Sequence, residues 1–116
     1  MNTPGGFYLT KTLQDAAAAT GAGESLLILG DAFGGQEMVV IQLSGTFTAT
    51  VTFQATANGV TWADVEFTPL AALDTPATTA TTAGLYQANL KGCLRVRANI
   101  TAYTDGDVTA YAVAVA

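Results

Sequence analysis

Apolar and polar residues alternate strictly between Thr46 and Ala55. The odd-numbered positions, which we call the apolar parity, are Phe47, Ala49, Val51, Phe53 and Ala55. The other parity holds only threonines and Gln54. Successive side chains of a β-strand point to opposite faces, so this period of two predicts a strand with one buried face and one polar face. The polar face carries no charge, and we expect it to be scaffolding that can lie against another protein.

The same period recurs over residues 94–102, where every second residue is apolar. This register places Arg95 and Arg97 together on the outward face of a predicted strand. A pair of arginines could meet a carboxylate patch on a neighbouring protein, and both are therefore candidate partner contacts. An ordinary solvated strand face is the alternative.

Residues 108–115 are apolar on both faces. Alanines and Val108 occupy one parity, and the other parity holds Tyr111, Val113 and Val115. A strand of this kind lies centrally in a sheet or forms an intersubunit contact, so these three residues are also candidate partner contacts.

Two dipeptides predict tight hairpins. Asn58-Gly59 and Asp105-Gly106 both suit two-residue turns with positive φ. The first turn would return the chain into a strand over 60–67, where the apolar parity changes phase. We attribute this phase change to a β-bulge near Ala63-Asp64.

Further strands are expected at 38–44, apolar on both faces for part of its length, and at 85–90. The Thr/Ala-rich segment 71–84 reads as a loop that is functional or structurally tied down. This spacing of short strands predicts an all-β fold, an antiparallel β-sandwich of jelly-roll or Ig-like type, over residues 36–116.

Residues 1–35 differ in composition and predict an extended N-terminal arm. We expect a short helical turn near Asp15–Ala19 and a short strand over 25–29. Such an arm needs a surface to lie on. Its apolar residues Phe7, Tyr8 and Leu9 are candidate partner contacts.

Charge is sparse in this chain. Only 11% of the 116 residues are charged, whereas about 25% is usual in a soluble domain. A surface with so little charge is poorly protected against association, so we expect it to be covered by partners or by identical copies of the chain. The net charge of -5 argues against a nucleic-acid partner.

The sequence also argues against a membrane partner, because no apolar run reaches the roughly 20 residues of a membrane span. The N-terminus lacks the basic and apolar regions of a signal peptide, so we expect synthesis in a host cytoplasm without processing.

Groups that could carry out catalysis are scarce. The sequence has no histidine, and neither Ser25 nor Ser44 lies in a nucleophile motif. We interpret Cys93 as a small core residue and the pair Asp105/Asp107 as turn formers rather than cation ligands. We therefore expect no enzymatic activity, no cofactor and no metal site.

Trp62 has two interpretations. It could be an exposed glycan-stacking platform, as in sugar-binding sandwiches, or it could pack into the core behind the Asn58-Gly59 turn. The second interpretation is favoured by Val60 in the same register.

A resemblance covers residues 38–116. The segments "VIQLSGTFTATVTFQATANGVTWADVEF" and "GLYQANLKGCLRVRANITAYTDGDVTAYAVAVA" resemble small β-sandwich virion proteins of tailed bacteriophages. The shared elements are a Gly-Thr-aromatic strand start, an Asn-Gly-x-x-Trp hairpin, a Gly-Leu-Tyr strand and an Arg-x-Arg strand. The resemblance implies a structural role on a virion. Within that class we favour a capsid decoration (cement) protein on the head surface, which binds the major capsid protein and stabilises the head. The resemblance also implies a homo-oligomer, a dimer or trimer.

Two alternatives remain open. One is an accessory protein of the tail or neck. The other is a carbohydrate-binding β-sandwich, because "ANGVTW" is similar to a hairpin of discoidin-like domains. Ala57-Asn58 stands where that family has Asn-Asp, and the paired cysteines of the family are absent.

Overall fold

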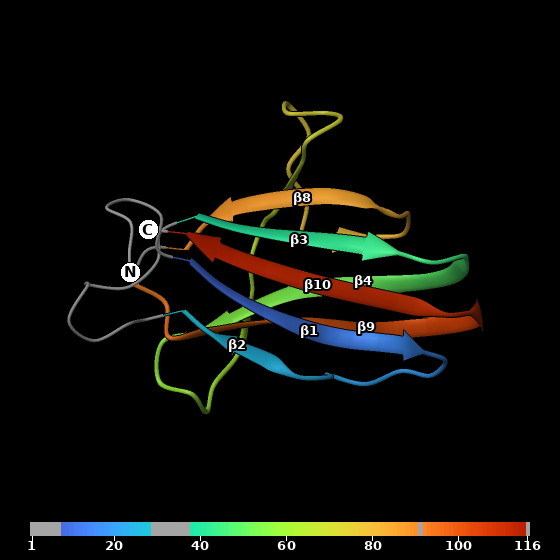
Figure 1. The fold of residues 1–116 in the computed structure, drawn as a ribbon, viewed down its shortest axis with the longest axis horizontal. Helices are drawn as coiled ribbons and strands as arrows, with labels where there is room; N and C mark the ends of the chain where they lie inside the picture. The colour runs from blue at the N-terminus through green and yellow to red at the C-terminus, as the bar shows by residue number, and fades with distance from the viewer. Residues whose placement is uncertain (1–7, 29–37, 91, 116) are drawn as a thin grey trace.

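The computed structural model describes residues 8–28, 38–90 and 92–115 of the chain. All regular structure in these residues is β, and the strands form two antiparallel sheets. The prediction of an antiparallel β-sandwich is confirmed. Figure 1 shows β1, β10, β3 and β8 side by side in the front layer, with β4 and β9 crossing behind them.

The strands of sheet A lie in the order β1-β10-β3-β8-β6. Their bounds in that order are Tyr8–Ala17, Val108–Val115, Met38–Ser44, Gly84–Asn89 and Thr68–Pro69. Sheet B has the order β2-β9-β4-β5, and β7 also pairs with β4. The bounds of β2, β9, β4, β5 and β7 are Ser25–Leu27, Arg95–Gly106, Phe47–Thr56, Ala63–Asp64 and Thr79–Ala80.

The core lies between the two sheets and follows the predicted parity. Val51 and Phe53 on β4 are fully buried. The ring of Phe53 stacks on Phe67 with centroids 4.6 Å apart and meets Tyr86 at 5.4 Å. Burying a side chain of this size contributes roughly 1.5–3 kcal/mol, so this aromatic cluster joins the sheets strongly. The polar side of β4 is less exposed to solvent than expected, because Thr52 is also buried.

Two sheet-to-sheet corners lie against each other at one end of the sandwich, on the right in Figure 1. The chain passes from β3 to β4 through Gly45 and from β9 to β10 through Gly106 and Asp107. The N–H of Asp107 donates to the carbonyl of Thr46 at 3.1 Å. A Cβ on Gly106 would lie 2.0 Å from the same carbonyl oxygen, so the backbones touch without room for a side chain.

This geometry corrects one prediction. Asp105-Gly106 does not form a hairpin, because β9 belongs to sheet B and β10 to sheet A. Gly106 does adopt the predicted positive φ, 88°. The local turn signal was therefore right, but the glycine is used to change sheets.

The N-terminal region also differs from the prediction. Residues 8–17 form β1, which pairs along most of its length with β10, so the helical turn expected near Asp15–Ala19 is wrong. The short strand expected over 25–29 is present as β2 at Ser25–Leu27. Where we expected a separate arm, the described part supplies an edge strand to each sheet.

Gln14 explains why this region packs onto the sandwich. Its side chain is buried, and its amide nitrogen donates to the carbonyls of Gly21 at 3.0 Å and Ala98 at 2.9 Å. One amide thus satisfies two backbone acceptors and ties β1 to β9 across the gap between the sheets.

The predicted tight hairpin at Asn58-Gly59 is a longer loop. The pairing of Ala55 with Ala63 leaves residues 56–62 in the connection. Gly59 has a φ of 80°, but Asn58 does not have the positive φ that a type I′ turn requires. The Asn58 side-chain oxygen instead accepts hydrogen bonds from the N–H groups of Val60 and Thr61, both at 2.8 Å, and closes an Asx turn.

The return strand predicted over 60–67 is interrupted. Of these residues only Ala63–Asp64, β5, form a strand with β4, and the chain then crosses to sheet A, where β6 pairs with β8. The phase change that we attributed to a bulge at Ala63-Asp64 is this change of sheet. Pro69 is accommodated because β6 is an edge strand.

The segment 71–84 is a loop for most of its length, and it rises above β8 in Figure 1. Its Thr79–Ala80 stretch, β7, pairs with Val51 and Thr52 of β4. Ala80 is buried, so this loop is tied down by the sheet rather than free.

Candidate interaction surfaces

Reactive side chains do not converge in the described part of the chain. Among residues 8–28, 38–90 and 92–115, no group of three or more His, Cys, Asp or Glu residues could hold a metal ion. Cys93 is half-buried and packs against the core. The carboxylate of Asp105 accepts a hydrogen bond from the N–H of Gly106 at 2.9 Å and so stabilises its corner. The same residues contain no helix that is long and apolar enough to cross a membrane.

The outward side of sheet B carries an interlocked polar network around Arg97. The Arg97 Nε donates to the side-chain oxygen of Gln54 at 2.8 Å. The Gln54 amide nitrogen donates to the Asp64 carboxylate at 2.9 Å, and Asn99 donates to the same Gln54 oxygen at 3.3 Å. Gln54 is therefore fixed from two sides and holds the guanidinium in one orientation. We call this surface, with Arg95, Trp62 and Ser25, the sheet B face.

Trp62 belongs to this network, and the core interpretation of Trp62 is wrong. Its side chain is half-buried, and the Arg97 guanidinium carbon lies 4.1 Å from the ring centroid. This distance is well inside the range of cation–π contacts. Val60, which favoured core packing, is 80% exposed. The ring therefore supports Arg97 at the surface, and one of its faces is already covered.

Arg95 lies one row from Arg97 on the same face, as predicted. Its guanidinium donates to the hydroxyl of Ser25 at 3.2 Å. Across the described ranges the one ion pair is Lys11–Glu24, at 3.9 Å between exposed side chains. Neither arginine is thus paired with a carboxylate in the described part of the chain, and both can accept one from a partner.

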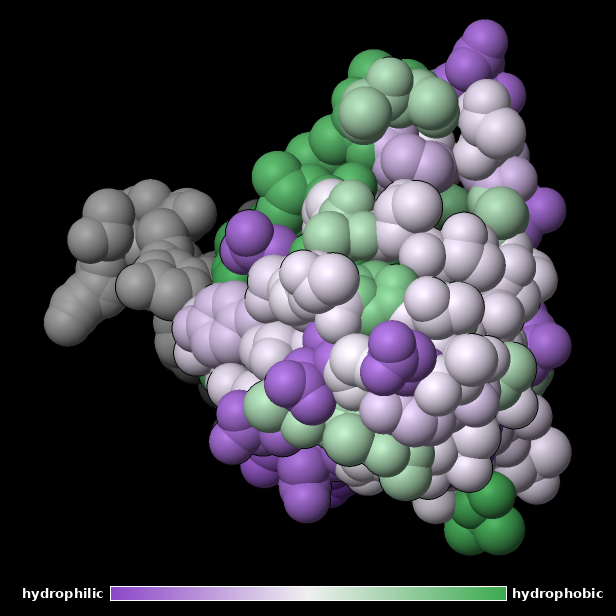
Figure 2. All heavy atoms as spheres, turned by 90° about the vertical axis from the view of Figure 1, so that its right-hand side faces the viewer, coloured by the Kyte–Doolittle hydropathy of each residue, from purple (hydrophilic) through white to green (hydrophobic). Residues whose placement is uncertain are grey.

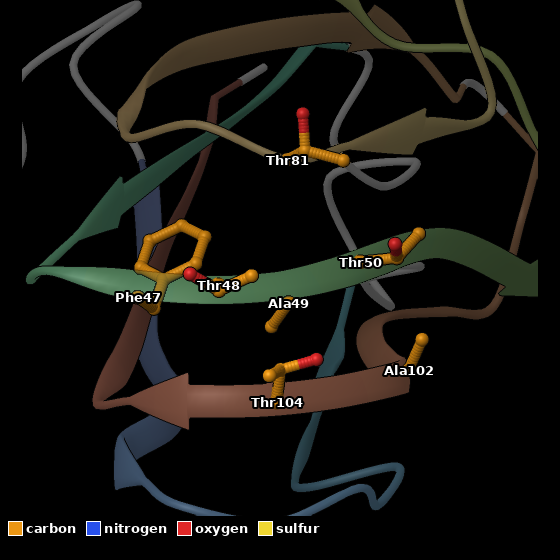
Figure 3. A pocket seen from close by; sticks show the side chains of 7 residues that line it. All are labelled: Phe47, Thr48, Ala49, Thr50, Thr81, Ala102 and Thr104. Atoms are coloured by element: carbon orange, nitrogen blue, oxygen red, sulfur yellow. The ribbon is translucent and has the colours of Figure 1, made fainter.

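A shallow, open hollow of about 300 Å³ continues the sheet B side toward the corners. Figure 3 shows its lining, which comes from β4, β9 and the loop after β7. The lining residues are uncharged and four of them are threonines: Phe47, Thr48, Ala49, Thr50, Thr81, Ala102 and Thr104. Such a lining offers threonine hydroxyl groups, which can donate hydrogen bonds to a ligand and accept them from it.

The other predicted contacts lie on the opposite side of the sandwich. Tyr111, Val113 and Val115 point outward from β10, which lies between β1 and β3 in sheet A. Tyr111 is 40% and Val115 38% exposed. The structure therefore divides the predicted contact residues between two opposite faces, with arginines on one and apolar side chains on the other.

Of the N-terminal candidates, Leu9 is the one whose side chain the structure describes. It pairs with Ala114 on the inward parity of β10, and its half-buried side chain packs against the core, not on the outer face; its role as a partner contact stays a prediction. The backbone of Tyr8 pairs with Val115, and its side chain lies outside what the structure describes. Phe7 also lies outside the described residues.

Other members of both faces could not be found from the sequence. Leu70 and Leu85 are 39% and 43% exposed and lie beside each other at the β8 edge of sheet A. In Figure 2, a view onto the corner end, strongly hydrophobic spheres gather at the upper left, on the side of β8 and the outer face of sheet A. Gln54 was expected on a polar face, but its position beside Arg97 depends on the pairing of β4 with β9.

Two solved structures share this fold. The SPBc2 prophage-derived protein YomS superposes with a TM-score of 0.81 and 18% identity, over 95% of this chain and 94% of that chain. The PBSX exported protein XepA superposes with a TM-score of 0.85 and 15% identity, over 95% of this chain and 38% of that chain. This chain thus corresponds to less than half of XepA.

No protein-family model and no curated protein matches the sequence. Identities of 15% and 18% establish the fold alone. The chain is therefore a β-sandwich of the kind found in a prophage-derived protein.

Proposed function

We propose that this chain is a non-enzymatic structural protein of a bacteriophage particle, and that within this class it is a capsid decoration (cement) protein. The observation that carries the proposal is the full-length match to a prophage-derived protein, which covers 95% of this chain and 94% of YomS. The superposition thus spans almost all of this chain and almost all of the solved YomS chain. A role in assembly is supported because both broad faces offer groups for recognition: oriented arginines on sheet B and exposed apolar side chains on sheet A.

The sheet B face suits the contact with the major capsid protein. Arg95 and Arg97 are held by Ser25 and Gln54 and lack carboxylate partners among the described residues. A guanidinium that is already oriented loses less conformational entropy when it binds a carboxylate than a free side chain does. An acidic patch on the capsid surface is therefore the partner that this face fits.

An electron-microscopy map of the phage particle tests the location. We expect density for the sandwich at the junctions between capsomers, with the sheet B face toward the capsid. Density at the neck or tail would favour the accessory alternative and overturn the cement role. Absence of the protein from purified particles, measured by mass spectrometry, would overturn the virion role altogether.

Stabilisation of the head is tested with particles stripped of the protein. Added protein should restore resistance to heat, and the Arg95→Gln/Arg97→Gln variant should bind at least tenfold more weakly. Lys11→Gln is a matched control, because Lys11 is a cation outside the sheet B face, paired weakly with Glu24. Equal heat resistance of stripped and decorated particles would rule out cementing.

Carbohydrate binding remains a second candidate because the half-buried Trp62 ring lies against Arg97, whose polar network includes Gln54, Asn99 and Asp64. Planar polar groups next to an aromatic ring can hold sugar hydroxyls. Arg97 covers one face of the ring, so a sugar could stack only on the other. Binding to a glycan array that Trp62→Ala abolishes would support this candidate, and no binding by the native protein would exclude it.

A further inference from the structure

The outer face of sheet A has a composition unlike that of the sheet B face. Antiparallel pairing aligns its outward side chains in three rows across the strands. The first row holds Leu70, Leu85, Gln42, Tyr111 and Thr12; the second Thr68, Gln87, Val40, Val113 and Thr10; the third Asn89, Met38 and Val115. We call these residues the sheet A face. None of them is charged.

This face also concentrates exposed apolar side chains. Four of the seven large hydrophobic residues that are exposed among the described residues lie here, each 38% to 43% exposed: Leu70, Leu85, Tyr111 and Val115. The other three, Leu27, Val60 and Leu73, lie outside this face. The expectation that 38–44 is apolar on both faces is met only in part, since Val40 is half-buried and Gln42 is exposed. The rows nevertheless form a continuous uncharged surface with an apolar centre, which is typical of an interface.

The edges of sheet A, in contrast, are protected. Edge strand β1 has two register shifts and carries Lys11 on its core-side parity. The opposite edge, β6, is only Thr68–Pro69, and proline cannot donate a hydrogen bond to an added strand. Irregular edges with a charge or a proline prevent strand addition. Association through this sheet is therefore expected face to face and not edge to edge.

We propose that the sheet A face is the contact between two copies of this chain, related by a two-fold axis near Val113 and Val40. A second copy is the occupant that the charges favour. The described carboxylates lie on loops, on the corners, at the end of β1 and on β5, so two copies can meet here without opposing like charges despite the net charge of -5. Sheet A has the same twist in both copies, so the two sheets can pack face to face in the aligned manner of a β-sandwich.

The size of the face predicts the strength of the contact. Five strands about 4.8 Å apart and three rows about 7 Å apart span roughly 450 Å² per copy, or about 900 Å² in total. Interfaces below about 1,200 Å² belong to weak complexes, so we expect a dissociation constant on the order of tens of micromolar. Such a dimer forms at high protein concentration or where copies are held side by side.

Sedimentation velocity of the full chain tests the proposal. The sedimentation coefficient should rise from the monomer to the dimer value between about 5 µM and about 500 µM protein. Leu85→Asp should keep the protein monomeric throughout, because it places two carboxylates in the apolar interface. Leu27→Asp is the matched control: Leu27 is the same residue type, is equally exposed at 43% and lies on the opposite sheet, so this variant should dimerise normally.

Each outcome decides the matter. Native protein that stays monomeric over the whole range overturns the proposal, and so does any dimer that Leu85→Asp leaves intact. Val115→Asp, near the end of β10, replaces Leu85→Asp if the latter lowers the melting temperature. The measurement uses isolated protein, so its failure is distinct from failure of capsid binding.

Discussion

The two touching corners give the sharpest test of the fold, through Gly106→Ala. An added Cβ would lie 2.0 Å from the Thr46 carbonyl oxygen and 2.7 Å from the Cα of Phe47, whereas non-bonded heavy atoms prefer about 3.5–4.0 Å. These atoms are backbone, so only a shift of the whole corner can relieve the overlap. That shift would also weaken the hydrogen bond from Asp107 to Thr46, worth about 1 kcal/mol.

Gly92→Ala separates this overlap from the cost of a positive φ. Gly92 has a φ of 92°, close to the 88° of Gly106, but a Cβ there would meet nothing within 4 Å. Left-handed backbone costs roughly 1–2 kcal/mol for alanine, and reduced freedom of the unfolded chain returns about 0.4–1 kcal/mol. We therefore expect Gly92→Ala to cost about 1 kcal/mol. For Gly106→Ala, overpacking of about 1–3 kcal/mol and the weakened hydrogen bond of about 1 kcal/mol are added, and we expect a loss of about 4 kcal/mol.

Urea denaturation and calorimetry measure the difference. For 116 residues, 1 kcal/mol shifts the melting temperature by about 4 °C, so we expect losses of about 16 °C for Gly106→Ala and about 4 °C for Gly92→Ala. Equal losses within about 0.5 kcal/mol would show that the corners relax freely, and the contact between Gly106 and Thr46 would then not constrain the sandwich.

Substitutions at three further contacts test each contact singly, in every case by urea denaturation. A double-mutant cycle with Trp62→Ala and Arg97→Ala should give a coupling of about 0.5–1 kcal/mol, since the pair is half-exposed; a Trp62→Ala loss of 3–5 kcal/mol would return this residue to the core. Asn58→Ala should cost about 1 kcal/mol because two N–H groups lose their acceptor, whereas Asn58→Asp should cost little. Gln14→Ala should cost about 1–3 kcal/mol by leaving two carbonyls without a donor, and a neutral result would mean that water replaces the amide.

The residues that the sequence placed correctly are those whose environment depends on parity alone. Val51, Phe53, Val96 and Ile100 were expected inside, and all four are buried. A strand with one apolar parity has only one way to bury it, whichever strands become its neighbours. The β-sandwich could therefore be predicted without knowledge of the strand order.

The errors arose where a local signal has two global outcomes. Gly106 adopts the expected positive φ, but whether the chain then returns in the same sheet depends on Thr46, sixty residues earlier in the sequence. Trp62 looked like a hairpin anchor, yet its ring is paired with Arg97, which β9 brings alongside β4. In both cases the environment of the residue depends on a contact with a residue that is distant in the sequence. Neither a dipeptide nor the alternation of apolar residues can predict such a contact.

The same limitation applies to the candidate surfaces. Arg97 and Val113 were both correctly expected to face outward, but parity cannot say that they face in opposite directions. That separation follows from the corner at Gly106, which sends β9 to sheet B and β10 to sheet A. The corner thus fixes how the two recognition surfaces are arranged, as well as the stability of the fold.

The arrangement has a consequence for assembly if the two proposals hold together. A dimer formed through the sheet A face would leave a sheet B face, with its Arg97 network, on each of its two outer sides. Two such faces on one particle could engage two acidic patches at once, and the second contact would form at a high effective concentration. Each contact is weak by itself. The dimer would therefore bind firmly only where two acidic patches are spaced so that both of its sheet B faces can bind at once. Leu85→Asp, which keeps the protein monomeric, leaves only one sheet B face per particle. Its affinity for phage particles should therefore fall strongly, although its arginines are intact.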